Sequence, residues 1–352
     1  MHDRSIAFLK HLLATPGPSG DEVAAGRVWR READTFADRV YADVRGNSYA
    51  VLDGGAPRVL LAGHIDEIGL MVNYIDDEGY LWFAPIGGWD PQVLVGQRVR
   101  LNGRAGDVVG VIGKKPIHQM KPDEREKASK IEDLWIDIGA SNRADAEALV
   151  RVGAAGVLDA PIYDLPGDKI VSRSIDDRIG AFTVLEALRL LAHDRPHATV
   201  AAVATAQEEI TFAGAHTAAF SFEPQVAIAV DVTFATDHPN ADKKQYGNIH
   251  LGGGPVLSRG SANSPLVYEM LVAIAEREAI PYAIQSNPGS TGTDADAIHV
   301  SRGGVATGVI SIPNRYMHSP NEMIALADVE HAARLIAAFV RNLGPETDFV
   351  PW

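Results

Sequence analysis

The chain has 352 residues, with 32 Lys and Arg against 46 Asp and Glu, which gives a formal net charge of −14. This excess of negative charge disfavours nucleic acids and anionic membranes as partners. The sequence contains no cysteine, which excludes disulfides, thiolate metal sites, iron–sulfur clusters and cysteine nucleophiles, so a bound metal would have to be held by His, Asp and Glu.

The N-terminal part of the chain is predicted to alternate between helix and strand. Amphipathic spacing predicts a helix over residues 3–14, and a second helix with an acidic first turn follows the Pro- and Gly-rich break and ends near Asp34. Residues 40–52 predict a strand and a turn. The apolar run 59–62 predicts a short strand that leads directly into Gly63-His64-Ile65-Asp66.

The middle of the chain has a different pattern. From Ile68 to about Asp164, short strand-like runs alternate with turns rich in Gly, Asp and Pro. One clear helix is predicted over residues 143–150, and residues 120–130 are charged and loop-like. We therefore expect residues 68–164 to form an inserted β-barrel or sandwich.

After residue 169, strands and helices alternate again. Helices are predicted over residues 177–191, 214–220, 265–278, 293–300 and 326–343, and strands over residues 198–205, 226–230, 282–285 and 305–311. Such alternation predicts an α/β fold with a largely parallel sheet flanked by helices, formed here by residues 1–67 and 165–352. No uncharged apolar run approaches the ~18 residues of a membrane span, and the N-terminus lacks a secretory pattern, so we expect a cytoplasmic protein.

Histidines and carboxylates follow several of the predicted strands, and ligands of open α/β sheets bind outside the carboxyl ends of the strands. The candidates are His64, Asp66, Asp176, Asp177, Glu208, Glu209, Asp231 and His318. Taken alone, Asp176-Asp177 could be a helix N-cap with a solvated neighbour, and Glu208-Glu209 an acidic helix start. Asp231 follows an apolar run, where an unpaired carboxylate is costly.

The combination is more informative than any single residue. Two histidines and three carboxylates can supply ligands for two divalent metals that share one bridging carboxylate. A further carboxylate would then be free to transfer protons, and the adjacent pair Glu208-Glu209 offers one ligand and one base. Asp66 could fix the tautomer of a metal-binding His64.

The sequence resembles the tetrahedral (TET) dodecameric metallo-aminopeptidases, a family that includes glutamyl and deblocking aminopeptidases and some members labelled cellulase or endoglucanase. The matching segments occur in family order over almost the whole chain. They are PGPSGDE (16–22), GHIDEIGLMV (63–72), GGWDPQVLVGQRV (87–99), KKPIH (114–118), DLWIDIGA (133–140), SIDDRIG (174–180), AQEE (206–209), VDVT (230–233), GTDADAIH (292–299) and IPNRYMHSPNE (312–322).

The resemblance implies a dinuclear metal centre. His64 and Asp231 would hold one ion, Glu209 and His318 the other, and Asp176 would bridge both. It also implies zinc, cobalt or manganese as cofactors. The β-rich insertion would be a dimerisation domain, and dimers would assemble into hollow dodecamers.

The resemblance also implies roles for residues that do not bind the ions. Glu208 would be the general base, Asp66 would orient His64, and Asp177 would support the bridging aspartate. The chain departs from the family after the glutamate pair, because Thr211 stands where the family often has Gly and Ala213 where it often has Arg. These departures put the local loop geometry in question.

We therefore expect a dinuclear metal-dependent aminopeptidase that acts on short peptides. A related amidohydrolase, such as a deacylase of N-acyl amino acids, is an alternative. A glycoside hydrolase would use a carboxylate pair and leave both histidines without a role. A non-enzymatic binding protein would leave the complete ligand set without a metal.

Overall fold

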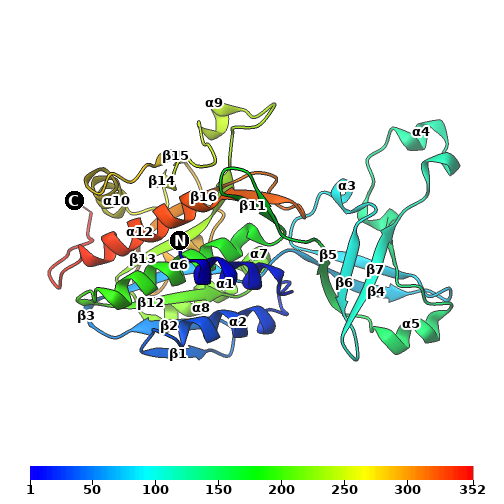
Figure 1. Cartoon of the computed structure of the whole chain (residues 1–352), viewed down its shortest axis with the longest axis horizontal. Helices are drawn as coiled ribbons and strands as arrows, with labels where there is room; N and C mark the ends of the chain where they lie inside the picture. Colours follow the sequence, from blue (N-terminus) through cyan, green and yellow to red (C-terminus); the bar gives the residue numbers. More distant parts are fainter. Residues whose placement is uncertain (352) are drawn as a thin grey trace.

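The computed structural model describes residues 1–351, which form an α/β body and a β-barrel that projects from one end of it (Figure 1). An eight-stranded mixed sheet runs through the body in the order β1-β2-β12-β3-β13-β16-β14-β15. Its strands are β1 (Arg39–Ala42), β2 (Ser48–Leu52), β3 (Gly55–His64), β12 (Ala198–Thr205), β13 (Val226–Phe234), β14 (Val256–Gly260), β15 (Ala283–Asn287) and β16 (Ala306–Asn314). The four central strands β12, β3, β13 and β16 are parallel, as the sequence pattern predicts, and antiparallel pairs occur toward both edges.

Helices cover both faces of this sheet. One face packs against α1 (Asp3–Ala14), α2 (Val23–Ala33), α6 (Ile175–His193), α10 (Pro265–Arg277) and α12 (Leu326–Arg341). The other face packs against α8 (Ala213–Phe222) and α11 (Ala295–Ile298). Successive strand residues point to opposite faces, so that Leu61 belongs to the first core and Leu60 to the second. Two covered faces explain why the central strands are continuously apolar.

The barrel closes in the order β4-β5-β8-β7-β6-β9 and has an apolar core of its own. Its strands are β4 (Gly69–Ile75), β5 (Leu81–Ile86), β6 (Arg98–Asn102), β7 (Asp107–Gly113), β8 (Trp135–Asp137) and β9 (Ala155–Leu158). The helices of this region are α3 (Pro91–Leu94), η1 (Ile117–Gln119), α4 (Pro122–Arg125), η2 (Ile131–Asp133) and α5 (Arg143–Leu149). All six strands lie inside the predicted insertion, while its limits at residues 68 and 164 stay a prediction.

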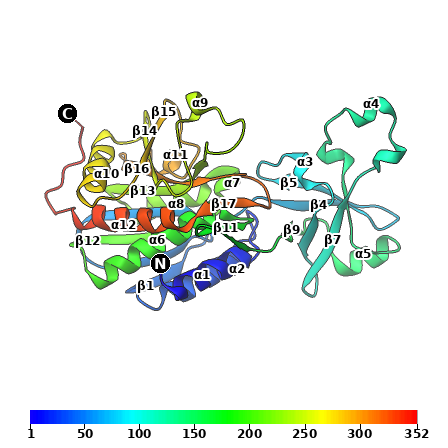
Figure 2. The same ribbon diagram turned by 45° about the horizontal axis from the view of Figure 1, so that its top comes forward.

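A small three-stranded sheet lies beside the central one. It consists of β10 (Tyr163–Leu165), β11 (Lys169–Ser172) and β17 (Glu322–Ala325). Two short helices complete the fold, α7 (Glu208–Thr211) and α9 (Lys243–Tyr246). Both ribbon views place the barrel near α7, at the end of the body opposite the C-terminus (Figures 1 and 2). Within residues 1–351, no helix combines the length and the apolar character needed to cross a membrane.

The structure corrects several predicted boundaries. The strand predicted to end at Val230 continues to Phe234, because β13 pairs with β16 along its whole length and Asp231 itself is opposite Ser311. Asp231 therefore lies inside a strand and not beyond its end. The predicted helix at 293–300 shortens to α11, and the predicted loop at 120–130 contains the one-turn helix α4. Pairing with distant strands forms β11, β14 and β17, which the local pattern did not predict.

Candidate active site

The candidate residues come together at one edge of the central sheet. His64 is the last residue of β3, the Glu208-Glu209 pair follows the end of β12, and Asp231 lies near the end of β13. Because these strands are parallel, their carboxyl ends meet at the same edge. Asp176 reaches this edge from the first turn of α6, and His318 from the loop between β16 and β17.

His64 is directed at the cluster by its own loop. Its Nδ1 lies 3.1 Å from the backbone carbonyl oxygen of Asp66 and 3.5 Å from the Asp66 carboxylate. Its Nε2 lies 3.1 Å from Asp176 Oδ1 and 3.7 Å from Glu208 Oε2. One ring nitrogen is therefore held by the loop, and the other faces carboxylates, as a metal-binding histidine requires.

A second histidine faces the same aspartate from the other side. His318 Nε2 lies 3.4 Å from Asp176 Oδ2 and 3.4 Å from Glu209 Oε1. Its Nδ1 lies 2.7 Å from the carbonyl oxygen of Gly88, which belongs to the segment after β5. The two oxygens of Asp176 thus face two different histidines.

Two groups of side chains have ligand atoms close enough to hold an ion. His64, Asp176 and Glu209 form one group, and His64, Asp177 and Asp231 form the other, with the atoms of each group within 4.8 Å of one another. Glu209 Oε1 is buried and makes no hydrogen bond of normal geometry, although His318 Nε2 lies 3.4 Å from it. A bound cation would satisfy this oxygen. Imidazole and carboxylate donors in this arrangement fit zinc, cobalt or manganese.

Both oxygens of Asp177 accept backbone hydrogen bonds. Oδ2 accepts from the His64 N–H at 3.1 Å, and Oδ1 accepts from the Gly180 N–H at 2.9 Å. The helix can come this near the strand because a Cβ on Gly63 would lie 2.4 Å from the carbonyl carbon of Gly180. This geometry agrees better with support of the ligand segments than with direct ligation.

Asp66 joins the two loops that follow β3 and β12. Its carboxylate accepts hydrogen bonds from Ser19 Oγ at 2.6 Å, from the Glu208 N–H at 3.0 Å and from the Glu209 N–H at 3.3 Å. Gln207, directly before the pair, has a φ of 62°, a left-handed conformation that is uncommon outside glycine. Asp66 therefore holds the backbone of the glutamate pair in addition to its contact with His64.

Glu322 is a buried residue of this site to which the sequence analysis assigns no role. Its carboxylate accepts from the Asp176 N–H at 3.1 Å and from the His318 N–H at 2.9 Å. It therefore links the central aspartate to the second histidine. The sequence feature that could have indicated this role is its position four residues after His318, in a segment that resembles the family.

Burial and mutual repulsion shift the pKa values of these groups strongly. Burial raises the pKa of Glu208 to about 10, with further increases from Asp231, although His64 opposes the shift. The pKa of Asp231 is raised well above its usual range, first by burial and then by Asp176. Burial lowers the pKa of His318, but its bonds to Asp176 and Glu209 outweigh this and raise it to about 11. Such a site retains protons that cations could replace.

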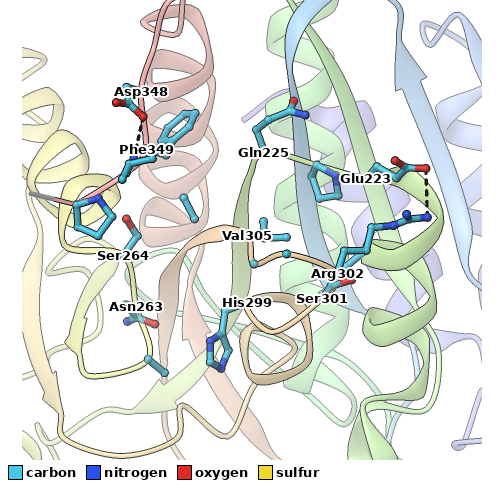
Figure 3. Close-up of a pocket in the computed structure, with 18 of the residues that line it drawn as sticks. Glu223, Gln225, Asn263, Ser264, His299, Ser301, Arg302, Val305, Asp348 and Phe349 are labelled. Carbon is cyan, nitrogen blue, oxygen red and sulfur yellow. Dashed lines mark hydrogen bonds and ion pairs between the residues drawn. The ribbon is translucent and has the colours of Figure 1, made fainter.

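The cluster opens into a cavity of about 660 Å³. Its charged lining consists of His64, Asp176, Glu208, Glu209, Asp231 and His318. A larger groove of about 780 Å³ lies elsewhere, at the start of β13 and along the C-terminal segment (Figure 3). In that groove the charges of Glu223 and Arg302 pair with each other at 3.1 Å. The clustered histidines and carboxylates therefore line the smaller cavity.

Comparison with known proteins agrees with this geometry. A profile of the family described as M42 glutamyl aminopeptidase matches residues 46–335. The chain belongs to the M42 family. As an M42 peptidase it is a hydrolase, and both the α/β class and the resemblance found in the sequence are confirmed.

Similar proteins match almost the whole length of this chain. Lysyl aminopeptidase of Pyrococcus furiosus is 38% identical over 98% of this chain and 99% of its own length. A TET aminopeptidase from a marine sediment archaeon of the Thaumarchaeota superposes with a TM-score of 0.93 at 36% identity, and covers 97% of each chain. The TET1 peptidase of Pyrococcus horikoshii has a TM-score of 0.86 at 32% identity over 96% of this chain and 100% of its own, and can assemble into a tetrahedron or a large octahedral shell.

The departures from the family pattern lie beside the site of this M42 chain. Thr211 ends α7 and Ala213 begins α8, and neither side chain lines the cavity. Phe212, between them, does line it, and its φ of 53° places this bulky residue in the left-handed region. The two departures therefore flank a residue of the cavity wall and leave the ligand cluster complete.

Proposed function

We propose that this chain is a dinuclear metal-dependent aminopeptidase that removes N-terminal residues from short peptides. The observation that carries the proposal is the position of Asp176, whose two oxygens face His64 at 3.1 Å and His318 at 3.4 Å. A carboxylate between two histidines is the arrangement that a pair of neighbouring cations needs.

Five residues would hold the cations. His64 and Asp231 would bind one ion, Glu209 and His318 the other, and Asp176 both, with zinc, cobalt and manganese as the candidate metals. When bound, these ions would polarise the scissile carbonyl and lower the pKa of water. The unpartnered buried oxygen of Glu209 supports this assignment.

Glu208 would be the general base. It lines the cavity, lies 3.7 Å from His64, and is held through its backbone by Asp66. Its carboxylate would take a proton from the attacking water and pass it to the leaving amine.

Carboxylates around the cavity also favour a substrate with a free amino terminus. The α-ammonium group is cationic, and clustered carboxylates attract it at short range. An N-acylated substrate lacks this charge, and a sugar chain lacks both the charge and the peptide bond. This reasoning favours an aminopeptidase over the deacylase and the glycoside hydrolase.

Assembly and location belong to the same proposal. We infer a homo-oligomer in which the barrel is a dimerisation domain and dimers build a dodecamer, because the similar TET1 peptidase forms closed shells. The predicted cytoplasmic location is retained as part of this proposal. Light scattering of the purified protein tests the assembly directly.

The decisive experiment compares free and blocked substrates. The protein is stripped with chelator, reloaded separately with zinc, cobalt or manganese, and assayed on aminoacyl anilides, their N-acetyl forms and cello-oligosaccharides. We expect hydrolysis of the free aminoacyl substrates, loss of activity on stripping and recovery on reloading. Equal turnover of the N-acetyl forms, or full activity after stripping, would refute the proposal.

A further inference from the structure

Outside the cluster, the lining of the cavity is electrically neutral. Within residues 1–351, every charged side chain that lines the cavity belongs to the metal-binding and base residues described above. The remaining lining has apolar side chains, Phe212, Phe234, Tyr246 and Met317, and neutral amides, Gln245, Gln285 and Asn287. We call these seven residues the neutral wall.

The aromatic part of the neutral wall offers contact area without charge. The rings of Phe234 and Tyr246 pack with centroids 6.0 Å apart. Phe212, directly after α7, also lines the cavity, and its backbone is in the left-handed region with a φ of 53°. Aromatic side chains supply large apolar contact areas for a hydrophobic group of a substrate.

The amide part of the neutral wall is uncharged, and one of its amides already forms a hydrogen bond within the protein. Gln285 Oε1 accepts a hydrogen bond from Thr233 Oγ1 at 3.0 Å, which orients the amide at the carboxyl end of the sheet. An amide forms hydrogen bonds to polar groups but cannot neutralise a full charge. Asp294, a nearby buried acid, is only 2% exposed and does not line the cavity, and one of its oxygens accepts a hydrogen bond from Thr205.

The side chain of an N-terminal residue that enters this cavity can contact the neutral wall. A charged side chain would find no opposite charge there to pair with. A hydrophobic side chain would cover aromatic surface that is otherwise exposed, since Phe234 is 51% and Tyr246 40% exposed. The cluster carboxylates would hold the cations and the α-amino group, so that the side chain of the N-terminal residue would meet the neutral wall.

We propose that the enzyme prefers peptides whose N-terminal residue has an uncharged side chain, with hydrophobic residues such as leucine, methionine and phenylalanine first. This preference rests on the proposed aminopeptidase function. It distinguishes the chain from the lysyl specificity named for its Pyrococcus furiosus relative and from the glutamyl specificity named in the family description.

A substrate panel tests the preference. Free aminoacyl anilides of leucine, methionine, phenylalanine, glutamine, lysine, arginine, glutamate and aspartate are compared by kcat/KM at one metal loading. We expect the hydrophobic substrates to exceed the charged ones by about 10- to 100-fold. A lysyl, arginyl, glutamyl or aspartyl substrate at the top of the panel overturns the preference and leaves the aminopeptidase function standing. No hydrolysis of any substrate refutes both.

One substitution tests whether the neutral wall contacts the first side chain. Gln285→Glu keeps the acceptor for Thr233 and adds one negative charge. We expect the ratio of lysyl to leucyl kcat/KM to rise about tenfold, because the new carboxylate can pair with the lysine ammonium. An unchanged ratio would overturn the assignment of this wall.

Gln225→Glu is the matched control. Gln225 lines the separate groove at the start of β13, and its Oε1 accepts a hydrogen bond from the Arg58 N–H at 2.6 Å (Figure 3). The substitution makes the same change in chemistry and net charge at a position outside the neutral wall. The lysyl to leucyl ratio should stay as in the parent protein. A rise equal to that of Gln285→Glu would show a general charge effect and overturn the proposal.

Discussion

The guanidinium of Arg178 and the carboxylate of Glu67 form an ion pair of 2.9 Å in the interior of the protein. Each residue directly follows an acidic residue of the site, because Glu67 comes after Asp66 and Arg178 after Asp177. Arg178 is fully buried and also donates to the carbonyl oxygen of Ile65 at 3.0 Å. The pair therefore connects the loop after β3 with the first turn of α6 behind the ligand cluster.

Loss of this ion pair should destabilise the fold. Arg178→Met leaves the Glu67 carboxylate buried with Arg173 as its remaining cation, and we expect the free energy of unfolding to fall by about 3–5 kcal/mol. Denaturant titration of the metal-free protein at fixed concentration measures this change. Arg39→Met, which breaks an exposed pair with Asp53, should cost less than about 1 kcal/mol. Similar losses in the two variants would contradict the prediction.

Substitutions of the two adjacent glutamates should have different effects on catalysis and on metal binding. Glu208→Gln removes the proposed base, and we expect kcat to fall by about 10²- to 10⁴-fold with metal content unchanged. Glu209→Gln removes a proposed ligand and should lower the metal content itself. Elemental analysis after dialysis, together with kcat, distinguishes the two. Near-normal turnover in Glu208→Gln would exclude this residue as the base.

Asp176 should matter to both ions at once. Asp176→Asn removes the negative charge of the side chain that faces both histidines. We expect the metal affinity to be about tenfold or more weaker than in the parent, and less than one tightly held ion per subunit. Asp328→Asn is a suitable control, since Asp328 is a buried aspartate that accepts backbone hydrogen bonds from Gly252 and Gly254 away from the cluster. Full metal occupancy in Asp176→Asn would rule out a bridging role.

Stability of the chelator-treated protein should fall as the pH rises. The pKa of Glu208 is raised from 4.5 to about 10 by burial, and that of His318 from 6.5 to about 11 by its carboxylate partners, against the effect of burial. Between the unfolded and folded pKa values, the folded chain keeps protons that the unfolded chain has already released. Each increase in pH within this range therefore favours unfolding. Zinc binds the deprotonated groups, and its stabilising effect should grow with pH.

Thermal melts with and without zinc, between about pH 6 and about pH 9, measure both trends. The melting temperature of the stripped protein should decrease across this range, and the increase on zinc addition should become larger. A melting temperature that rises with pH in the stripped protein would contradict the sign. Melts of Glu208→Gln should show a weaker dependence, because this variant lacks one of the titrating groups.

The sequence carried enough information for the ligand segments and the α/β class. His64, the two acidic pairs, Asp231 and His318 each follow an apolar or helical pattern that can be recognised locally, and their segments resemble a family. Glu322 and the cavity wall were not assigned, because their roles depend on contacts across long distances in the chain. Glu322 binds the backbone of Asp176, which lies 146 positions away.

The sequence by itself determined the chemistry available to this protein: a chain without cysteine, with histidine and carboxylate side chains placed beside predicted strands and helices. The tertiary structure decided which of these groups meet. Strand order, the parallel pairing of β12, β3 and β13, and the close approach of α6 at Gly63 and Gly180 set the separations, since hydrophobic patterns specify which face of an element is buried but not which elements become neighbours. For the same reason, the neutrality of the cavity wall could be recognised only after residues from five separate segments had been brought together.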